Sequence, residues 1–210
     1  MSADVEHFWE QHYGAAERVW SGRANATLVD VVQDLPPGTA LDLGCGEGGD
    51  AVWLALRGWQ VTAVDVSSTA LRRTGEHAAQ AGVADRVTTA QHELGRSFPD
   101  GAYDLVSAAF LHAPVEVDLQ RDDVLRRAAA AVAPGGVLVV VSHATPPPWA
   151  PPEHAAHARF PTPQEVLDAL QLPLHAWSTE RAELVGRTAT GPHGRTGHLE
   201  DGLVVVRRLT

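Results

Sequence analysis

Short apolar segments alternate with longer amphipathic ones along most of this chain. The segments typical of buried strands are 39–43, 60–65, 86–90, 103–109 and 136–142. Each is short, rich in small or branched apolar residues, and bounded by turn residues. The segments with helical periodicity between them are 49–57, 67–81 and 122–132. Strands that alternate with helices of this length predict βαβ units, a parallel sheet and right-handed connections.

The N-terminal residues predict a helical cap on this pattern. Residues 5–20 are amphipathic, and a second helix is expected over 24–34. A turn at Ser21 and Gly22 separates the two helices. The second helix ends at 36–38 (Pro-Pro-Gly), because proline cannot continue the backbone ladder of a helix.

The C-terminal third follows a different pattern. Residues 144–163 are rich in proline, alanine and histidine and predict an insertion over one end of the sheet. A short helix is expected at 163–170. Strand-like segments around 175–185 and 202–208 then indicate an antiparallel hairpin at the sheet edge.

These elements predict one α/β domain over the 210 residues. The expected fold is a Rossmann-like, doubly wound, mostly parallel sheet with helices on both faces and a C-terminal antiparallel hairpin. Its expected parts are the N-terminal helical cap (1–35), the cofactor-binding core (36–143), the insertion (144–163), and the C-terminal helix with edge strands (164–210).

Composition is that of a globular protein and narrows the possible partners. The hydrophobic fraction is 44%, the charged fraction is 20%, and the formal net charge is -10. Phosphates repel such a charge, so no nucleic-acid partner is expected. The N-terminus is acidic, one cysteine excludes an internal disulfide, and no apolar run reaches the ~20 residues that span a bilayer. We therefore expect a cytoplasmic monomer or homodimer with no membrane partner.

A glycine-rich turn follows the first predicted strand. Gly44, Gly46 and Gly49 satisfy the G-x-G-x-x-G pattern between a strand and a helix. That pattern is weak by itself, since nicotinamide-binding folds share it. Asp65 ends the next strand, where a carboxylate would bind the hydroxyl pair of a ribose. Together these features predict a ligand that contains adenosine.

Two further carboxylates distinguish among such ligands. Asp42 lies two residues before Gly44, and Glu47 lies in the turn itself. A dinucleotide would place its pyrophosphate on this turn. Like charges about 4 Å apart repel by roughly 4 kcal/mol at an effective dielectric of about 20. The acidic turn therefore disfavours a pyrophosphate and favours a ligand with an ammonium and a sulfonium group.

In these residues the chain resembles a known family. Residues 41–48 (LDLGCGEG) are similar to the first motif of the class I S-adenosylmethionine-dependent methyltransferases, and Asp65 matches their second motif. Residues 103–107 (YDLVS) resemble the fourth-strand motif, and 133–138 (APGGVL) resemble the turn before the fifth strand. The matches follow the family's order and cover residues 20–142.

Within that family, the chain looks most similar to small bacterial enzymes of the thiopurine or tellurite-resistance type. Residues 20–25 (WSGRAN) resemble the segment that covers the cofactor in those enzymes. The resemblance implies that Trp20 stacks near the sulfonium and that Arg23 meets the cofactor carboxylate or a substrate anion. The alternatives are a core aromatic side chain and a solvated arginine.

The resemblance also implies how S-adenosylmethionine is held, with S-adenosylhomocysteine as the product. Asp42 and the backbone at 44–46, which includes Cys45, would bind the methionine end. Asp65 would bind the ribose hydroxyls, and Val66 would pack on the adenine.

The segment after the third strand would complete the adenine site. Glu93 is the best match to a carboxylate near the adenine amino group, although aspartate is commoner in the family. Gln91 and His92 are alternatives for that contact. Leu94 and Ala109 are also expected to contact the cofactor.

His112 is the candidate catalytic residue. It follows the fourth strand, and the carboxyl ends of strands face the ligand crevice in a doubly wound sheet. A histidine with a pKa near working pH would take a proton from a substrate hydroxyl, thiol or amine. His143, after the fifth strand, has a similar but weaker topological claim. Cys45 is not expected to be a nucleophile, because methyl transfer requires none.

The expected reaction is an in-line transfer of a methyl group to sulfur, selenium, tellurium, oxygen or nitrogen of a small molecule. The alternatives are an NAD(P)-binding oxidoreductase and a non-catalytic S-adenosylmethionine-binding protein. Asp42 and the lack of a Tyr-x-x-x-Lys pair argue against the oxidoreductase. His154 and His157 have helical spacing but match no metal signature, so no metal is expected. No sequence feature names the methyl acceptor.

Overall fold

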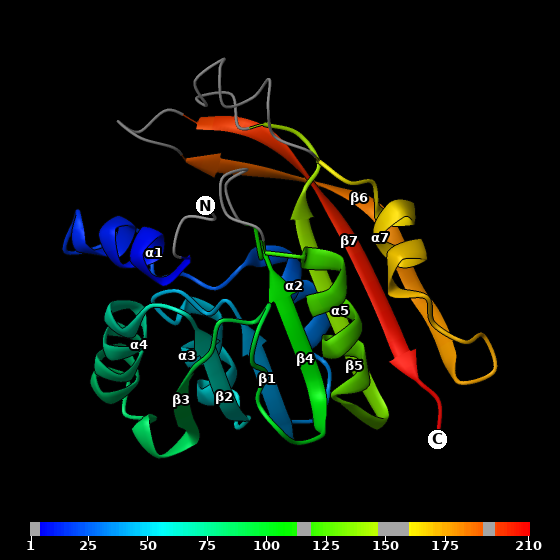
Figure 1. Cartoon of the computed structure of the whole chain (residues 1–210), viewed down its shortest axis with the longest axis horizontal. Coiled ribbons are helices and arrows are strands. Elements are labelled where there is room, and N and C mark those ends of the chain that lie inside the picture. The colour runs from blue at the N-terminus through cyan, green and yellow to red at the C-terminus, as the bar shows by residue number, and fades with distance from the viewer. Residues whose placement is uncertain (1–4, 113–118, 147–159, 191–195) are drawn as a thin grey trace.

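The computed structural model describes residues 5–112, 119–146, 160–190 and 196–210. Their strands form a seven-stranded sheet in the order β3-β2-β1-β4-β5-β7-β6 (Figure 1). The strands are β1 (Thr39–Leu43), β2 (Gln60–Asp65), β3 (Val87–Gln91), β4 (Tyr103–Ala109), β5 (Val132–His143), β6 (Trp177–Thr190) and β7 (Thr196–Arg208). Neighbouring strands are parallel except β7, which runs antiparallel to β5 and β6. This arrangement confirms the predicted doubly wound, mostly parallel sheet.

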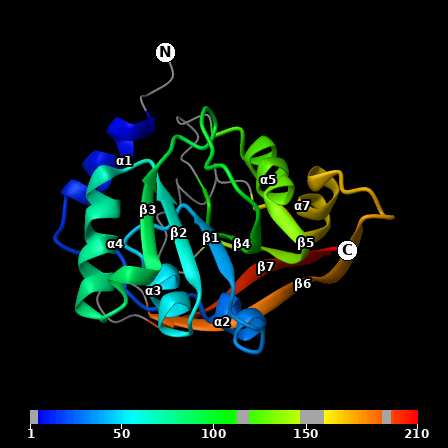
Figure 2. The ribbon, with the colours of Figure 1, turned by 90° about the horizontal axis from the view of Figure 1, so that it is seen from below.

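Helices cover both faces of this sheet. They are α1 (Val5–Gly14), α2 (Ala26–Val32), α3 (Gly49–Leu56), α4 (Ser68–Gln80), α5 (Arg121–Ala130) and α7 (Pro163–Leu170), with a short 3-10 helix η1 (Ala84–Arg86). Figure 2 shows α2 and α3 on one side of the sheet and α5 and α7 on the other. Helix α1 lies beside the start of α4, at the carboxyl edge of the parallel strands (Figure 1).

The two halves of the core follow from the alternation of side chains along each strand. In β2, Ala63 packs in the apolar cluster that contains Leu54 of α3. The next residue, Val64, packs in the opposite cluster with Leu125 of α5. All four side chains are fully buried. The central strands β1, β2 and β4 are thus mostly apolar on both faces, which explains their apolar runs in the sequence.

The N-terminal cap differs from its prediction. The helix predicted over 5–20 ends at Gly14. The chain then crosses to the glycine-rich turn, where the amides of Val19 and Trp20 donate to Glu47. A continued helix would have used those two donors internally. The second helix begins at Ala26, because the side chain of Asn25 is its N-cap and accepts hydrogen bonds from the backbone amides of Thr27 and Leu28.

The predicted C-terminal hairpin is confirmed, but its strands are longer than expected. Strand β7 pairs with β5 along its second half, so β6 alone of the two lies at the sheet edge. The helix predicted at 163–170 has those bounds. The proline- and histidine-rich insertion, with His154 and His157, lies mostly outside the described residues. No helix in the described ranges is long and apolar enough to cross a membrane.

Candidate functional site

The turn after β1 packs so closely on its neighbours that it requires glycine. Gly44 has φ +70° and Gly46 has φ +54°. A Cβ at Gly44 would lie 2.9 Å from Leu111 Cδ1, and a Cβ at Gly46 would lie 3.0 Å from the Tyr13 hydroxyl. Between them, the Cys45 amide donates to a β2 carbonyl at 2.9 Å. The glycine pattern of the sequence therefore forms a tight loop at the carboxyl edge of the sheet.

Asp65 ends β2 directly beside this loop. Its buried carboxylate accepts hydrogen bonds from the amides of Gly46 and Ser67, each at 2.9 Å. Burial raises the pKa of Asp65 above its ordinary value. Ser67 caps α4, because its hydroxyl accepts from the amide of Ala70. Val66 lies half-buried between the two polar residues. The ribose contact of Asp65 and the adenine contact of Val66 remain predictions.

A second buried carboxylate, Asp42, lies under the loop, and only one of its two oxygens has a hydrogen-bond partner in the described residues. Its Oδ1 accepts from the Ser107 hydroxyl at 2.9 Å, whereas its Oδ2 is buried without a hydrogen-bond partner among the described residues. Burial, and next the charge of Asp50, raise the pKa of Asp42 to about 7. Burial also raises the pKa of Asp50 to about 6. The backbone N–H of Asn25, which donates to the Asp50 carboxylate at 2.6 Å, opposes this shift. An orphaned carboxylate oxygen beside a second acid fits a cationic ligand.

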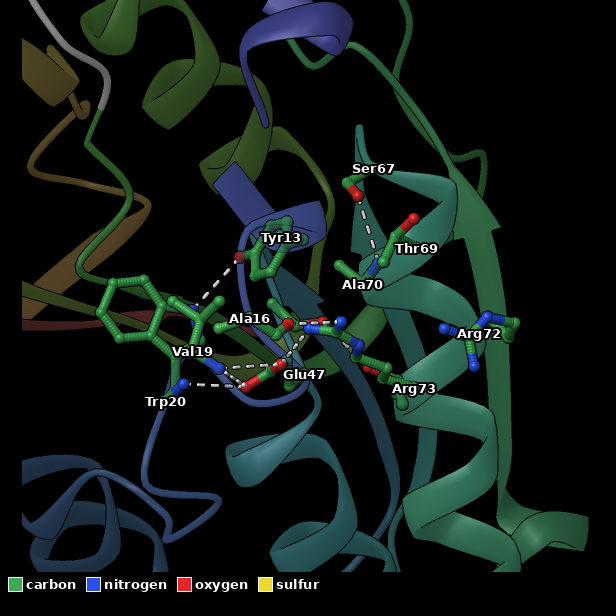
Figure 3. Close-up of polar contacts among 12 residues, drawn as sticks. Tyr13, Ala16, Val19, Trp20, Glu47, Ser67, Thr69, Ala70, Arg72 and Arg73 are labelled. Carbon is green, nitrogen blue, oxygen red and sulfur yellow. Dashed lines mark hydrogen bonds and ion pairs between the residues drawn. The ribbon is translucent and has the colours of Figure 1, made fainter. Parts of the chain in front are cut away.

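Glu47 has a different role from the one expected of an acidic turn residue. Its carboxylate accepts from the amides of Val19 and Trp20 and pairs with Arg73 at 2.7 Å (Figure 3). Burial favours its neutral form, but the amides and then Arg73 hold the pKa of Glu47 below its ordinary value. This charge is therefore neutralised within the protein. Asp42, and not Glu47, is therefore the carboxylate that disfavours a pyrophosphate on this turn.

The segment that Glu47 holds covers the glycine loop. Trp20 Nε1 donates to the Tyr13 hydroxyl at 3.3 Å, and both side chains lie against Gly46. Trp20 is still 51% exposed. Arg23 has an exposed side chain, and its backbone carbonyl lies close to Gly49. The structure thus brings Trp20 to the loop but leaves the side chain of Arg23 at the surface.

Helix α1 is fixed to the core by polar contacts that sequence analysis missed. Glu10 accepts hydrogen bonds from the hydroxyls of Ser67, Ser68 and Thr69 and from the Thr69 amide. Although burial opposes ionisation, these donors lower the pKa of Glu10 to about 2. Because Asp65 precedes this turn by two residues, α1 is attached directly beside the expected ribose site.

The residues after β3 have separate environments. The Gln91 side chain donates to the Val66 carbonyl at 2.9 Å and to Glu6 at 3.0 Å. Glu93 instead pairs with Arg96 at 3.0 Å. Leu94 is buried in the core beside α5. Of the alternatives for the adenine contact, Gln91 is therefore attached to the end of β2 by its side chain, and His92 by its backbone amide, which donates to the Asp65 carbonyl at 3.0 Å.

At the end of β4, Ala109 is half-buried and Phe110 has φ +54°. His112 follows them at the predicted carboxyl edge. Its proposed role as a base assumed a pKa near working pH, and the structure does not support that assumption. Burial, and next the charge of Arg121, lower the pKa of His112 to about 3. Arg121 donates to the carbonyl of Leu111, the residue before His112, at 3.1 Å, and this hydrogen bond holds the guanidinium near His112. His112 is therefore neutral at physiological pH and a weak base.

Cys45 is an inert thiol in this setting. It is buried, and burial followed by the charges of Asp65 and Asp42 raises the pKa of its thiol well above the ordinary value. A protonated, buried thiol is a poor nucleophile. Within the described ranges, no three His, Cys, Asp or Glu side chains are grouped to hold a metal ion.

Residues 40–136 match a family model described as a methyltransferase domain. A curated relative, the ribosomal RNA small subunit methyltransferase C of Alcanivorax borkumensis, is 47% identical over 51 residues. That match spans 24% of this chain and 16% of the relative, so the chain covers a small part of the relative's length.

Solved structures resemble the whole chain in fold. A structure described under the conversion of a disulfide bond into a thioacetal group during echinomycin biosynthesis has a TM-score of 0.73 at 20% identity, covering 98% of this chain and 93% of that one. TehB from Haemophilus influenzae has a TM-score of 0.67 at 16% identity, covering 99% and 68%. Magnesium protoporphyrin IX methyltransferase from Synechocystis PCC 6803, solved with bound S-adenosylhomocysteine, has a TM-score of 0.59 at 16% identity, covering 87% and 79%.

Proposed function

We propose that this chain, whose residues 40–136 match a methyltransferase-domain model, is a class I S-adenosylmethionine-dependent methyltransferase that methylates a small-molecule nucleophile. The observation that carries the proposal is the orphaned, buried oxygen of Asp42 under the glycine loop. A cofactor that ends in an ammonium and carries a sulfonium compensates this carboxylate, whereas a pyrophosphate does not.

The residues proposed to hold the cofactor are those that the structure gathers around the loop. Asp42 faces the methionine end together with the backbone of Gly44, Cys45 and Gly46. Asp65 exchanges its backbone hydrogen bonds in part for the ribose hydroxyls. When bound, S-adenosylmethionine supplies an activated methyl group whose leaving group is a neutral thioether.

The chain's own contribution is alignment and exclusion of water. Tyr13 and Trp20 already lie against Gly46, and Glu47 fixes the segment that carries Trp20. This segment is proposed to close over the methionine end of the cofactor. The acceptor then approaches from the carboxyl edge of β4 and β5, near Ala109 and His112.

A small acceptor is favoured over RNA by charge. The formal net charge of this chain is -10, and phosphate backbones are repelled by such a protein. The relative named for ribosomal RNA shares only a segment of 51 residues with this chain. A protein that modifies ribosomal RNA needs cationic contacts to phosphates, and no run of Lys and Arg supplies them here.

Calorimetric titration with S-adenosylmethionine and, separately, with NAD tests the cofactor. We expect binding of the first alone, and a loss of at least about tenfold in affinity, or 1.4 kcal/mol, in both Asp42→Asn and Asp65→Ala. Asp85→Asn, at an exposed position, is the matched control and keeps wild-type affinity. Binding of NAD alone would support the oxidoreductase instead.

Formation of S-adenosylhomocysteine over a panel of phenols, thiols, amines and chalcogen anions tests the transfer. Turnover of any small acceptor supports the proposal. A protein that binds S-adenosylmethionine but methylates none of them would be a non-catalytic binder, and the proposal would be wrong.

A further inference from the structure

A histidine and a carboxylate face one another beyond the cofactor loop, where β5 and β7 pair. The antiparallel register places His143 directly opposite Asp201. Asp201 is fully buried, and its carboxylate forms a two-point ion pair with Arg187 from β6. His143 Nδ1 is buried 3.6 Å from Asp201 Oδ1. This distance is just beyond a hydrogen bond, and such contacts often tighten when substrate binds.

The imidazole of His143 is also fixed between two rings. Phe110 stacks on it with centroids 4.2 Å apart and planes 20° apart. His112 stacks with centroids 5.5 Å apart and planes 15° apart, and His112 Nε2 accepts from the His143 amide at 3.4 Å. The His143 side chain remains 30% exposed. In the part of the chain that the structure describes, nothing hydrogen-bonds to its Nε2, which leaves that nitrogen for a ligand.

We propose that His143 Nε2 accepts the proton of a neutral hydroxyl or amine acceptor, and that Asp201 positions His143 for this task. The inference rests on the proposed methyl transfer and deepens it, since it names the acceptor class. The proposal assigns the role of proton acceptor to His143 in place of His112. His112 then acts as a neutral wall of the site.

The charges around His143 support this assignment. The charged and titratable groups that the described elements place near it are His112, Arg121, Arg187 and Asp201. Burial opposes ionisation of Asp201, but contacts with His143 and Arg187 hold its pKa below the ordinary value. An ionised carboxylate at Nδ1 stabilises the imidazolium that proton transfer creates.

The proposed step is balanced without a further reactant. The acceptor O–H or N–H bond breaks, and its proton moves to His143 Nε2. The lone pair of that oxygen or nitrogen forms the bond to the methyl carbon. The methyl–sulfur bond breaks with its electrons retained by sulfur, and the imidazolium later gives its proton to solvent.

The first test uses the ligand-free protein and no activity. NMR titration of the histidine Cε1–H signals, assigned against His143→Gln, gives the pKa of His143. We expect Asp201→Asn to lower that pKa by about one unit, because a nearby opposite charge is removed. An unchanged pKa overturns the inference.

A second readout needs no variant at Asp201, whose loss leaves Arg187 unpaired and risks misfolding. If Asp201 accepts from Nδ1, neutral His143 carries its proton there, and ¹⁵N chemical shifts identify that tautomer directly. A proton on Nε2 instead of Nδ1 overturns the inference.

The acceptor class is tested with phenol and thiophenol, which carry their acceptor atom on the same aromatic ring. Phenol is neutral at neutral pH, whereas thiophenol is largely ionised and needs no base. We expect His143→Gln to lower the phenol-to-thiophenol rate ratio by at least about 100-fold, and His175→Gln, an exposed control, to keep it. In the wild-type protein, the rate of phenol methylation is expected to decrease as the pH falls below the NMR-measured pKa of His143, because protonated His143 cannot accept a proton.

The possible failures of this test are distinguishable. Methylation of thiophenol without phenol, or an unchanged ratio in His143→Gln, overturns the role of His143 while the proposed function stands. Failure to bind S-adenosylmethionine, or to methylate any member of the wider acceptor panel, overturns both proposals.

Discussion

The carboxylates of Asp42 and Asp50 repel one another beneath the glycine loop. Burial and this repulsion together raise the pKa of Asp42 to about 7, while Asp50 is raised to about 6 by burial. Ser107 satisfies one oxygen of Asp42, and the other has no partner in the described residues. The site therefore holds negative charge that is unfavourable until a cation arrives.

The first prediction concerns the pH dependence of cofactor affinity. A cationic ligand favours ionised Asp42, so binding releases a proton whenever the pH is below the ligand-free pKa of about 7. Affinity for S-adenosylmethionine should fall by up to about tenfold per pH unit below that value. Calorimetry between about pH 5.5 and 8.5 measures this slope. Asp42→Asn should flatten it, and a steep slope retained in that variant would contradict the assignment.

The second prediction concerns stability without ligand. The folded-state pKa of Asp42 is raised to about 7. Asp42 is therefore fully neutral at low pH, where it does not destabilise the fold, and this advantage is lost as the pH rises through about 7 and Asp42 ionises. Asp42→Asn should therefore stabilise the ligand-free protein at alkaline pH by about 1–2 kcal/mol, or about 2–8 °C in Tm. Thermal unfolding at about pH 8 and pH 5 tests the sign, since the gain should shrink in acid. A lower Tm for the variant at pH 8 would count against it.

The third prediction compares two glycines. Gly46→Ala adds a Cβ 3.0 Å from the Tyr13 hydroxyl in a left-handed backbone conformation, at a cost of about 1–2 kcal/mol from the backbone alone. S-adenosylmethionine affinity should drop by at least about tenfold. Gly75→Ala is the matched control in α4, where an added Cβ meets nothing within 4 Å and should stabilise the helix by about 1 kcal/mol. Equal effects of the two substitutions on affinity would contradict the close packing of the loop.

The fourth prediction compares neighbouring arginines. Arg73 pairs with Glu47, whose side chain is 1% exposed, whereas Arg72 pairs with Glu76 at the surface (Figure 3 labels both arginines). Arg73→Met should destabilise the fold by about 1–3 kcal/mol, and it should speed chymotrypsin cleavage after Trp20. Arg72→Met should cost less than about 1 kcal/mol. Denaturant unfolding and timed proteolysis measure both, and similar cleavage rates would show that Glu47 does not hold this segment.

The local chemistry of the sequence determined much of this protein. The apolar runs located the strands, because a strand buried on both faces is apolar along most of its length. The glycine turn directly follows β1, Asp65 accepts from the Ser67 amide two residues later, and Ser67 caps α4 through the Ala70 amide three residues later. Short-range patterns of this kind can be read from the sequence, and they sufficed for the fold class and the cofactor family.

Tertiary structure decided what depends on residues far apart in the chain. The first helix ends early because the amides of Val19 and Trp20 meet Glu47, which comes from the loop after β1. His112 is a weak base because folding buries it beside Arg121. His143 meets Asp201 only through the register of β5 and β7. Burial and pairing at long range set charge states, and no local pattern encodes which distant side chain supplies the partner.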